Sequence, residues 1–187
     1  MVEDIATIVE MAVKDNEGIP VFLLGHSMGG LGVDLYGTKH PGRVSGIITI
    51  GGWLCDDSNA ASRVYDMDPM DYIAIMGADI CSDQAVIDRY MADPLVGKKT
   101  SAGLYQTCLS AQKWMWANIE KFSDPVLILQ GGDDKITPEY TSRDFFDKLK
   151  AADKSLMVFS GLGHEILNES CRRMIYRYIL DWIEMRL

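Results

Sequence analysis

The stretch of this chain that could carry out chemistry is a G-x-S-x-G sequence at residues 25–29, centred on Ser27. An apolar run precedes it and a helix-like segment follows, the setting in which this pattern places a serine on a sharp turn. Glycines are expected there because side chains would collide with the adjoining strand and helix. The helix directs free N–H groups toward the serine, where they can bind an oxyanion. The pattern predicts a nucleophilic Ser27, against the alternative of an incidental serine in a glycine-rich connection.

A serine hydroxyl is a weak nucleophile and needs a general base, and the chain has three histidines. His164 follows an apolar run in a glycine-flanked loop, the position from which a base reaches the carboxyl edge of a parallel sheet. His26 lies inside the serine turn, so its side chain should point away from that of Ser27. His40 precedes a proline in a surface-type loop, where a solvated or capping histidine is expected. The base is therefore predicted to be His164.

A buried carboxylate must hold the imidazole of the base in one tautomer. Asp133 and Asp134 both follow a buried strand, so either could serve, although Gly-Gly-Asp-Asp is also a turn-forming sequence. The chain order of serine, aspartate and histidine is that of the α/β-hydrolases and differs from the other serine-triad folds.

Helical and strand patterns alternate around these residues, which predicts an α/β fold with a mostly parallel sheet and flanking helices. The strands are expected to be buried on both faces because their apolar runs are continuous. The expected elements are a helix over 2–16, a strand over 19–24, a helix to about 38, strands over 45–50 and 126–129, a helix over 138–150, a strand over 155–159 and a helix from about 168. Residues 1–187 are predicted to form a single domain.

Residues 53–122 interrupt this alternation and are predicted to form a helical, lid-like insert within the domain. The segment shows no second buried strand and is rich in methionine and tryptophan. Methionine adapts to flexible ligands, so the insert suits a lid or an acyl-chain pocket. The alternative is that these side chains simply pack onto the sheet.

Composition narrows the class of protein further. The net charge of −9 argues against nucleic-acid binding. The start of the chain is acidic, unlike a signal peptide, and no apolar run is long enough to span a bilayer. The four cysteines are far apart, which favours reduced thiols and excludes a zinc site. A cytoplasmic protein is expected.

Four motifs together resemble the α/β-hydrolases of the monoacylglycerol lipase and lysophospholipase group, which includes serine aminopeptidases. They lie at residues 25–30, 93–96, 131–138 and 161–165. In the family pattern G-x-x-D-x-x-x-P the catalytic acid falls on Asp134, and the N–H of Met28 supplies one oxyanion donor. The resemblance implies hydrolysis of a lipophilic ester, such as a monoacylglycerol or lysophospholipid, through an acyl-enzyme on Ser27, without metal or cofactor. Peptidase and thioesterase activities are alternatives.

The chain departs from this family at its beginning. Family members have an N-terminal half that contributes the first strands and a second oxyanion donor, and nothing before Ser27 resembles it. The strand over 19–24 would then present an unpaired apolar edge. Two explanations are a fragment of a longer protein and a sheet completed by a second chain. A truncated, inactive or non-catalytic protein is the remaining alternative.

Overall fold

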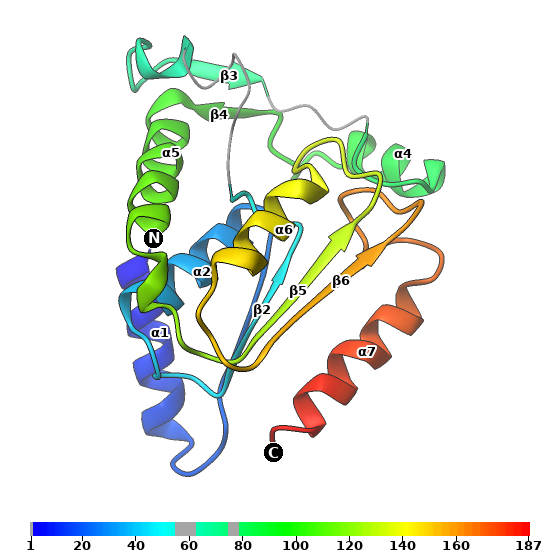
Figure 1. Ribbon diagram of the computed structural model, residues 1–187. Helices are drawn as coiled ribbons and strands as arrows, with labels where there is room; N and C mark the ends of the chain where they lie inside the picture. Colours follow the sequence, from blue (N-terminus) through cyan, green and yellow to red (C-terminus); the bar gives the residue numbers. More distant parts are fainter. Residues whose placement is uncertain (1, 55–62, 75–78) are drawn as a thin grey trace.

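The computed structural model describes residues 2–54, 63–74 and 79–187. Helices and strands alternate outside the insert, as Figure 1 shows. The helices are α1 (Val2–Asp15), α2 (Met28–Lys39), α4 (Gln84–Ala92), α5 (Ala102–Ala117), the 3-10 helix η1 (Ile119–Lys121), α6 (Glu139–Lys148) and α7 (Arg172–Glu184). The strands are β1 (Phe22–His26), β2 (Gly46–Ile50), β3 (Tyr72–Ala74), β4 (Lys99–Ser101), β5 (Val126–Gly131) and β6 (Lys154–Phe159).

Four strands form one parallel sheet in the order β1-β2-β5-β6. The register pairs Gly25 with Thr49 and Thr49 with Ile128, so the carboxyl ends of the strands lie at one edge. The turn after β1, the loop after β5 and the loop after β6 therefore meet there. The predicted α/β class with a parallel sheet and flanking helices is confirmed.

Both faces of the sheet are covered, and successive residues of the central strands point to opposite faces. Ile47 and Ile128 pack with the helices α2, α5 and α6, together with Phe122 after η1. Ile48 and Leu127 pack on the other face with α7. This explains why these strands are continuously apolar rather than alternating.

The first strand differs from its prediction in position and in burial. It begins at Phe22 rather than Ile19, and Ile19 is 63% exposed. Proline at position 20 has no N–H to donate to a strand ladder, which favours a later start. β1 also lies at the edge of the sheet, and Leu24 is 49% exposed, so burial on both faces was a wrong prediction. The predicted unpaired apolar edge is present in the described chain.

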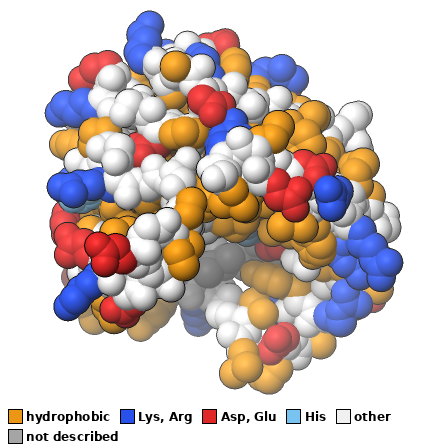
Figure 2. All heavy atoms as spheres, turned by 90° about the horizontal axis from the view of Figure 1, so that it is seen from below, with side chains coloured by type: hydrophobic (Ala, Val, Ile, Leu, Met, Phe, Trp, Pro, Cys, Tyr) orange, Lys and Arg blue, Asp and Glu red, His pale blue; other side chains and the backbone are white. Residues whose placement is uncertain are grey.

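The exposed side of β1 is the face that α7 covers only in part. Leu24 pairs in register with Ile48, whose side chain packs toward α7, so Leu24 points to that face. On α1, Ile8 and Met11 are also more than half exposed. Figure 2 shows hydrophobic side chains around a hollow in the molecule seen from below. Exposed apolar side chains of this kind are typical of surfaces that another segment covers.

The segment between β2 and β5 is not purely helical. Besides α4 and α5 it contains β3 and β4, which pair antiparallel with each other and stay separate from the main sheet. Each of these strands is only three residues long, and β4 (Lys99–Ser101) is polar, so the pair lacks the long apolar runs that mark the buried strands of the main sheet. Residues 55–62 and 75–78 of the predicted insert lie outside the described residues.

Two further expectations concern the end of the chain and its thiols. α7 begins at Arg172, later than the predicted 168. Cys81, Cys108 and Cys171 are free thiols, and Cys55 lies outside the described residues. In the described part of the chain, no helix combines the length and the apolar character needed to cross a membrane.

Candidate active site

Ser27 occupies the turn between β1 and α2 in a conformation that L-residues rarely adopt. Its φ is 56° and its ψ is −118°, and no other non-glycine residue in the described chain has a positive φ. Such a conformation costs about 1–3 kcal/mol, so the surroundings must enforce it. Ser27 N–H donates to Ile50 O at 3.0 Å, and Trp53 N–H donates to Ser27 O at 3.0 Å. The serine is thus held on a sharp turn whose backbone is tied to the end of β2.

Close backbone approach requires glycine at one of the two predicted positions beside Ser27 and at one position that was not predicted. A Cβ on Gly25 would lie 2.2 Å from Gly29 O, so no side chain fits there. A Cβ on Gly29 would meet nothing within 4 Å, so the expected collision at that end is wrong. The tight position is Gly30, where a Cβ would lie 2.7 Å from Gly52 Cα. α2 and the end of β2 meet at this point.

The predicted base and acid lie in direct contact. His164 Nδ1 and Asp134 Oδ2 are 2.8 Å apart, and both side chains are almost completely buried. Burial alone would raise the pKa of Asp134, but the hydrogen bond and charge of His164, with hydrogen bonds from Thr137, hold that pKa below its ordinary value. Asp133 is exposed, and its N–H donates to Leu162 O. The geometry therefore places Asp134, not Asp133, beside the imidazole.

Several polar groups that the sequence analysis missed surround the Asp134 carboxylate. Asp134 Oδ1 accepts the N–H groups of Ile136 and Thr137 at 2.8 and 2.9 Å. Asp134 Oδ2 lies 2.7 Å from Thr137 Oγ1 and 2.9 Å from Gln130 Nε2. Ser142 in turn donates to Gln130 Oε1. One of these groups could have been suspected from the sequence, because Gln130 is a polar residue that directly continues an apolar strand. In the structure Gln130 is fully buried, and a buried polar side chain needs hydrogen-bond partners.

The backbone around Gly51 contacts both the Ser27 turn and the His164–Asp134 pair. A Cβ on Gly51 would lie 3.2 Å from His164 Nδ1, and Gly51 O accepts from Thr137 Oγ1 at 3.1 Å. Gly51 stands between Ile50 and Trp53, the residues bonded to the Ser27 backbone. Within the described residues, no hydrogen bond joins the Ser27 hydroxyl to His164. Catalytic hydrogen bonds are often long before substrate binds.

The other two histidines take different places. His26 Nε2 lies 3.2 Å from the His164 carbonyl, so Nε2 carries the proton, and the two rings are 4.6 Å apart. His26 Nδ1 then faces Glu165 Oε1 at 3.9 Å. Burial lowers the pKa of His26 despite Glu165, which keeps its ring neutral. His40 ends α2 as its C-cap through its backbone N–H, which donates to Tyr36 O. Its side chain is neither solvated nor capping: the ring packs on that of Tyr36, with the centroids 5.0 Å apart, and Nε2 is buried without a hydrogen-bond partner in the described chain.

Met28 and the start of α2 face the serine turn. α2 begins at Met28, and the Ser27 side chain makes no capping hydrogen bond to the helix. The first N–H groups of a helix have no partner within it, and the helix dipole makes them favourable to negative charge. The turn thus presents donors where an oxyanion on a Ser27 adduct would form.

A carboxyl group that the sequence analysis did not single out lies beneath the turn. Asp34 on α2 is fully buried, and neither its two oxygens nor the Thr49 hydroxyl has a hydrogen-bond partner in the described chain. A Cβ on Gly52 would lie 3.4 Å from Asp34 Oδ2 and 2.8 Å from Thr49 Oγ1, so the two groups are neighbours. Burial raises the pKa of Asp34 to about 8, and the neighbouring Thr49 hydroxyl, which does not reach hydrogen-bond geometry, offsets that rise only in part.

Several aromatic and methionine side chains of the insert serve to pack it onto the sheet. Met115 is fully buried in the core beside α2, and Trp116 donates its indole N–H to Leu54 O at 2.6 Å. Trp53 packs edge-on against Tyr105. For these residues the structure agrees with the alternative that the insert's side chains simply pack onto the rest of the fold. Other apolar side chains of the insert, among them Met70 and Leu95, are exposed.

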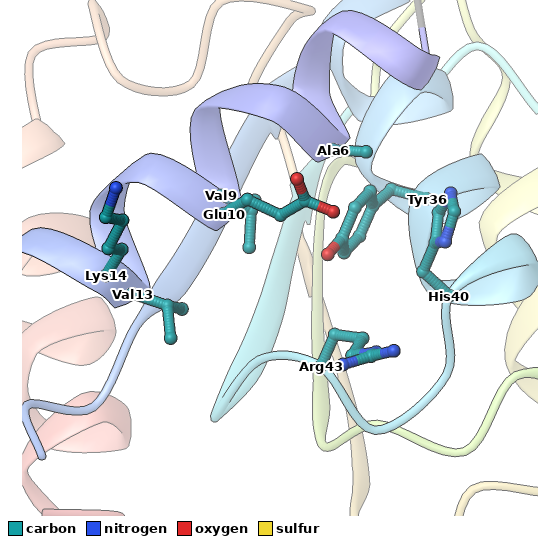
Figure 3. A pocket seen from close by; sticks show the side chains of 8 residues that line it. All are labelled: Ala6, Val9, Glu10, Val13, Lys14, Tyr36, His40 and Arg43. Carbon is teal, nitrogen blue, oxygen red and sulfur yellow. The ribbon is translucent and has the colours of Figure 1, made fainter. Parts of the chain in front are cut away.

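A cavity of about 240 Å³ lies apart from this site, between α1 and the C-terminal end of α2. Figure 3 shows Glu10, Tyr36 and Arg43 around it. Tyr36 is nine residues beyond Ser27 along the chain, roughly 14 Å along a helix at 1.5 Å per residue. The cavity therefore does not contain the Ser27 turn.

Comparisons with known proteins show the family to which the chain belongs. A family model described as serine aminopeptidase, S33, matches residues 1–171. The chain is 30% identical to the monoacylglycerol lipase of Mycolicibacterium smegmatis, spanning 100% of this chain and 70% of that protein. It is 26% identical to the human monoglyceride lipase, covering 99% of this chain and 65% of that protein. A crystal structure of a Paleococcus ferrophilus monoacylglycerol lipase superposes with a TM-score of 0.88 at 27% identity, covering 100% of this chain and 76% of that one.

Proposed function

We propose, on the premise that this chain belongs to the serine aminopeptidase S33 family of α/β-hydrolases, that it carries the catalytic machinery of a serine ester hydrolase. The observation that carries the proposal is the strained turn at Ser27 opposite the buried His164–Asp134 pair, with Gly51 between them. Strain on a solvent-accessible serine is typical of an activated nucleophile.

The proposed reaction uses each group in one role. Asp134 accepts the Nδ1–H of His164, which leaves Nε2 free to take the proton of Ser27. The Ser27 oxygen then attacks the ester carbonyl, and the Met28 N–H binds the oxyanion. Protonated His164 gives its proton to the leaving alcohol, and an acyl-enzyme remains on Ser27. Water activated by the same base releases the acid and restores the serine.

The proposed substrate is a lipophilic carboxylic ester, such as a monoacylglycerol or a lysophospholipid. The relatives from Mycolicibacterium smegmatis and human carry the names monoacylglycerol lipase and monoglyceride lipase. The exposed Met70 and Leu95 of the insert supply apolar surface for an acyl chain. The family model is described as a serine aminopeptidase, so an amide substrate is the second candidate.

A substrate panel tests the proposal. Monoacylglycerol, lysophospholipid, thioester and aminoacyl-amide substrates would be compared with the wild-type chain and its Ser27→Ala variant. We expect the esters to be hydrolysed fastest and the rate to vanish in Ser27→Ala. Preferred cleavage of the amide or thioester would establish a peptidase or thioesterase instead. A folded wild-type chain with no activity on any substrate would support the non-catalytic alternative.

We further propose that the open edge of β1 is covered by a strand from outside these residues, either from a longer chain or from a second copy. The exposed Leu24 and the apolar face of α1 support this. Such a strand could also bring a second oxyanion donor, whose loss typically costs about 100- to 1000-fold in turnover. Light scattering on the wild type and Leu24→Lys separates the two sources. A wild-type dimer that Leu24→Lys dissociates identifies a second copy, whereas a monomer with an unchanged mass points to a longer chain.

A further inference from the structure

The loop that carries His164 is held by the insert as well as by the sheet. On one side of His164, the N–H of Gly163 donates to Glu169 Oε1 at 3.0 Å. On the other side, the N–H of Glu165 donates to Ile80 O at 2.7 Å. The backbone of the proposed base is thus fixed on both sides, and Ile80 belongs to the insert.

Glu169 joins the two segments through a single buried carboxylate. Its Oε1 accepts the N–H of Ser82 at 2.8 Å as well as that of Gly163, and its Oε2 accepts the Ser82 hydroxyl. The side chain is fully buried, and in the described chain no lysine or arginine pairs with it. Burial alone would raise the pKa of Glu169, but the hydrogen bonds from Ser82 and Gly163 outweigh it and lower that pKa. The carboxylate therefore stays ionised and accepts from both segments.

The insert and the loop that carries His164 are packed closely enough that no side chain fits between them at Gly163. A Cβ on Gly163 would lie 3.1 Å from Cys81 Cα and 3.2 Å from Ile80 O. The two backbones touch at this point, directly before His164. A displacement of residues 80–82 would break the Glu169 and Ile80 hydrogen bonds together.

We propose that Glu169 is a positioning residue that couples the insert to the catalytic base. It acts through the backbone at Gly163, so the orientation of His164 against Asp134 depends on the placement of residues 80–82. The proposal rests on His164 being the base of the proposed function.

The side chain at position 169 can be changed in two ways that separate its roles. In Glu169→Gln the amide oxygen can accept both N–H groups, and the amide N–H can donate to the Ser82 hydroxyl, so the bridge remains. Glu169→Ala removes every acceptor. Ser82→Ala removes only the hydroxyl and gives a milder change. Glu120→Ala, an exposed glutamate on η1, is the matched control.

Two readouts would be recorded for each folded variant. One is the NMR signal of the His164 Nδ1 proton shared with Asp134, which needs no activity. The other is the rate of labelling by a fluorophosphonate. In Glu169→Ala we expect a broadened or missing Nδ1 signal and labelling slowed by about tenfold or more, since small misplacements of a catalytic group cost that much. Glu169→Gln should retain both, Ser82→Ala should fall between, and Glu120→Ala should match the wild type.

The outcomes distinguish this proposal from the proposed function. A Glu169→Ala or Ser82→Ala protein that is less stable to urea but keeps the wild-type Nδ1 signal and labelling rate would overturn the coupling. If Glu169→Ala does not fold, Ser82→Ala decides, and an unchanged Nδ1 signal there contradicts the proposal. A wild-type chain that shows the Nδ1 signal but does not label contradicts the proposed function alone. In that case the Nδ1 signal of the variants still tests the coupling.

Discussion

Replacing Asp34 by asparagine should change how the stability of the protein depends on pH. The Asp34 carboxyl is fully buried beneath the serine turn, has no hydrogen-bond partner in the described chain, and has its pKa raised from 3.8 to about 8. A carboxyl whose pKa is raised on folding favours the folded state least at high pH. Its unfolded form loses the proton near 3.8, whereas the folded form keeps it, so stability falls as pH rises between the two values.

The size of this change in unfolding free energy follows from how far the pKa of Asp34 is raised. From about pH 5 to about pH 7.5 the wild type should lose about 3 kcal/mol of unfolding free energy relative to Asp34→Asn, at about 1.4 kcal/mol for each pH unit in which only the unfolded chain is ionised. The asparagine side chain has nearly the same shape and does not titrate, so the difference between the two proteins isolates this carboxyl.

Urea unfolding of both proteins at several pH values in this range measures the difference. We expect the free-energy gap between Asp34→Asn and the wild type to grow steadily with pH in favour of the variant. A gap that stays constant would refute the reasoning, because Asp34 would then ionise alike in the folded and unfolded states. A gap that shrinks with pH would mean that the folded protein stabilises the charged form.

Three further predictions concern the site itself. Gly30→Ala should destabilise the protein by roughly 1–3 kcal/mol, because its Cβ would lie 2.7 Å from Gly52 Cα. Gly29→Ala should be neutral or stabilising, because its Cβ would meet nothing within 4 Å. Urea unfolding of the two variants measures the difference. Thr137→Val removes a hydrogen bond that lowers the pKa of Asp134, so the acid limb of the labelling rate should move to higher pH, and an unmoved limb would contradict that role. Asp134→Asn should fold normally yet label about 10⁴-fold more slowly, since an amide favours the wrong histidine tautomer.

The sequence was sufficient to predict where the residues of short local motifs lie in the fold. The G-x-S-x-G turn, the loop after β5 and the loop after β6 each follow an apolar run, and the structure brings all three to one edge of the sheet. The predicted likeness to the monoacylglycerol lipase group is confirmed by the family match and the relatives. The choice of Asp134 over Asp133 came from the family pattern, and the contact with His164 agrees with it.

What the sequence could not predict depends on contacts between distant segments. Hydropathy indicated a strand buried on both faces before Ser27, but Leu24 is half exposed because β1 lies at the edge of the sheet, and strand order is not contained in a local pattern. Gln130 and Thr137 reach Asp134 only once the chain has turned back on itself. Glu169 is a further case, because its partner Ser82 lies in the insert, far away in the sequence. The predicted roles of Ser27, Met28, Asp134 and His164 remain predictions.

Labelling of this chain with a fluorophosphonate, with the adduct located by peptide mass spectrometry, tests the central claim most directly. The wild type, Ser27→Ala and His164→Ala would be treated side by side after circular dichroism has shown that each is folded. We predict a single adduct on Ser27 in the wild type and none in either variant. A folded wild-type chain that does not label, or that labels on another residue, would contradict the assignment of Ser27 as the nucleophile.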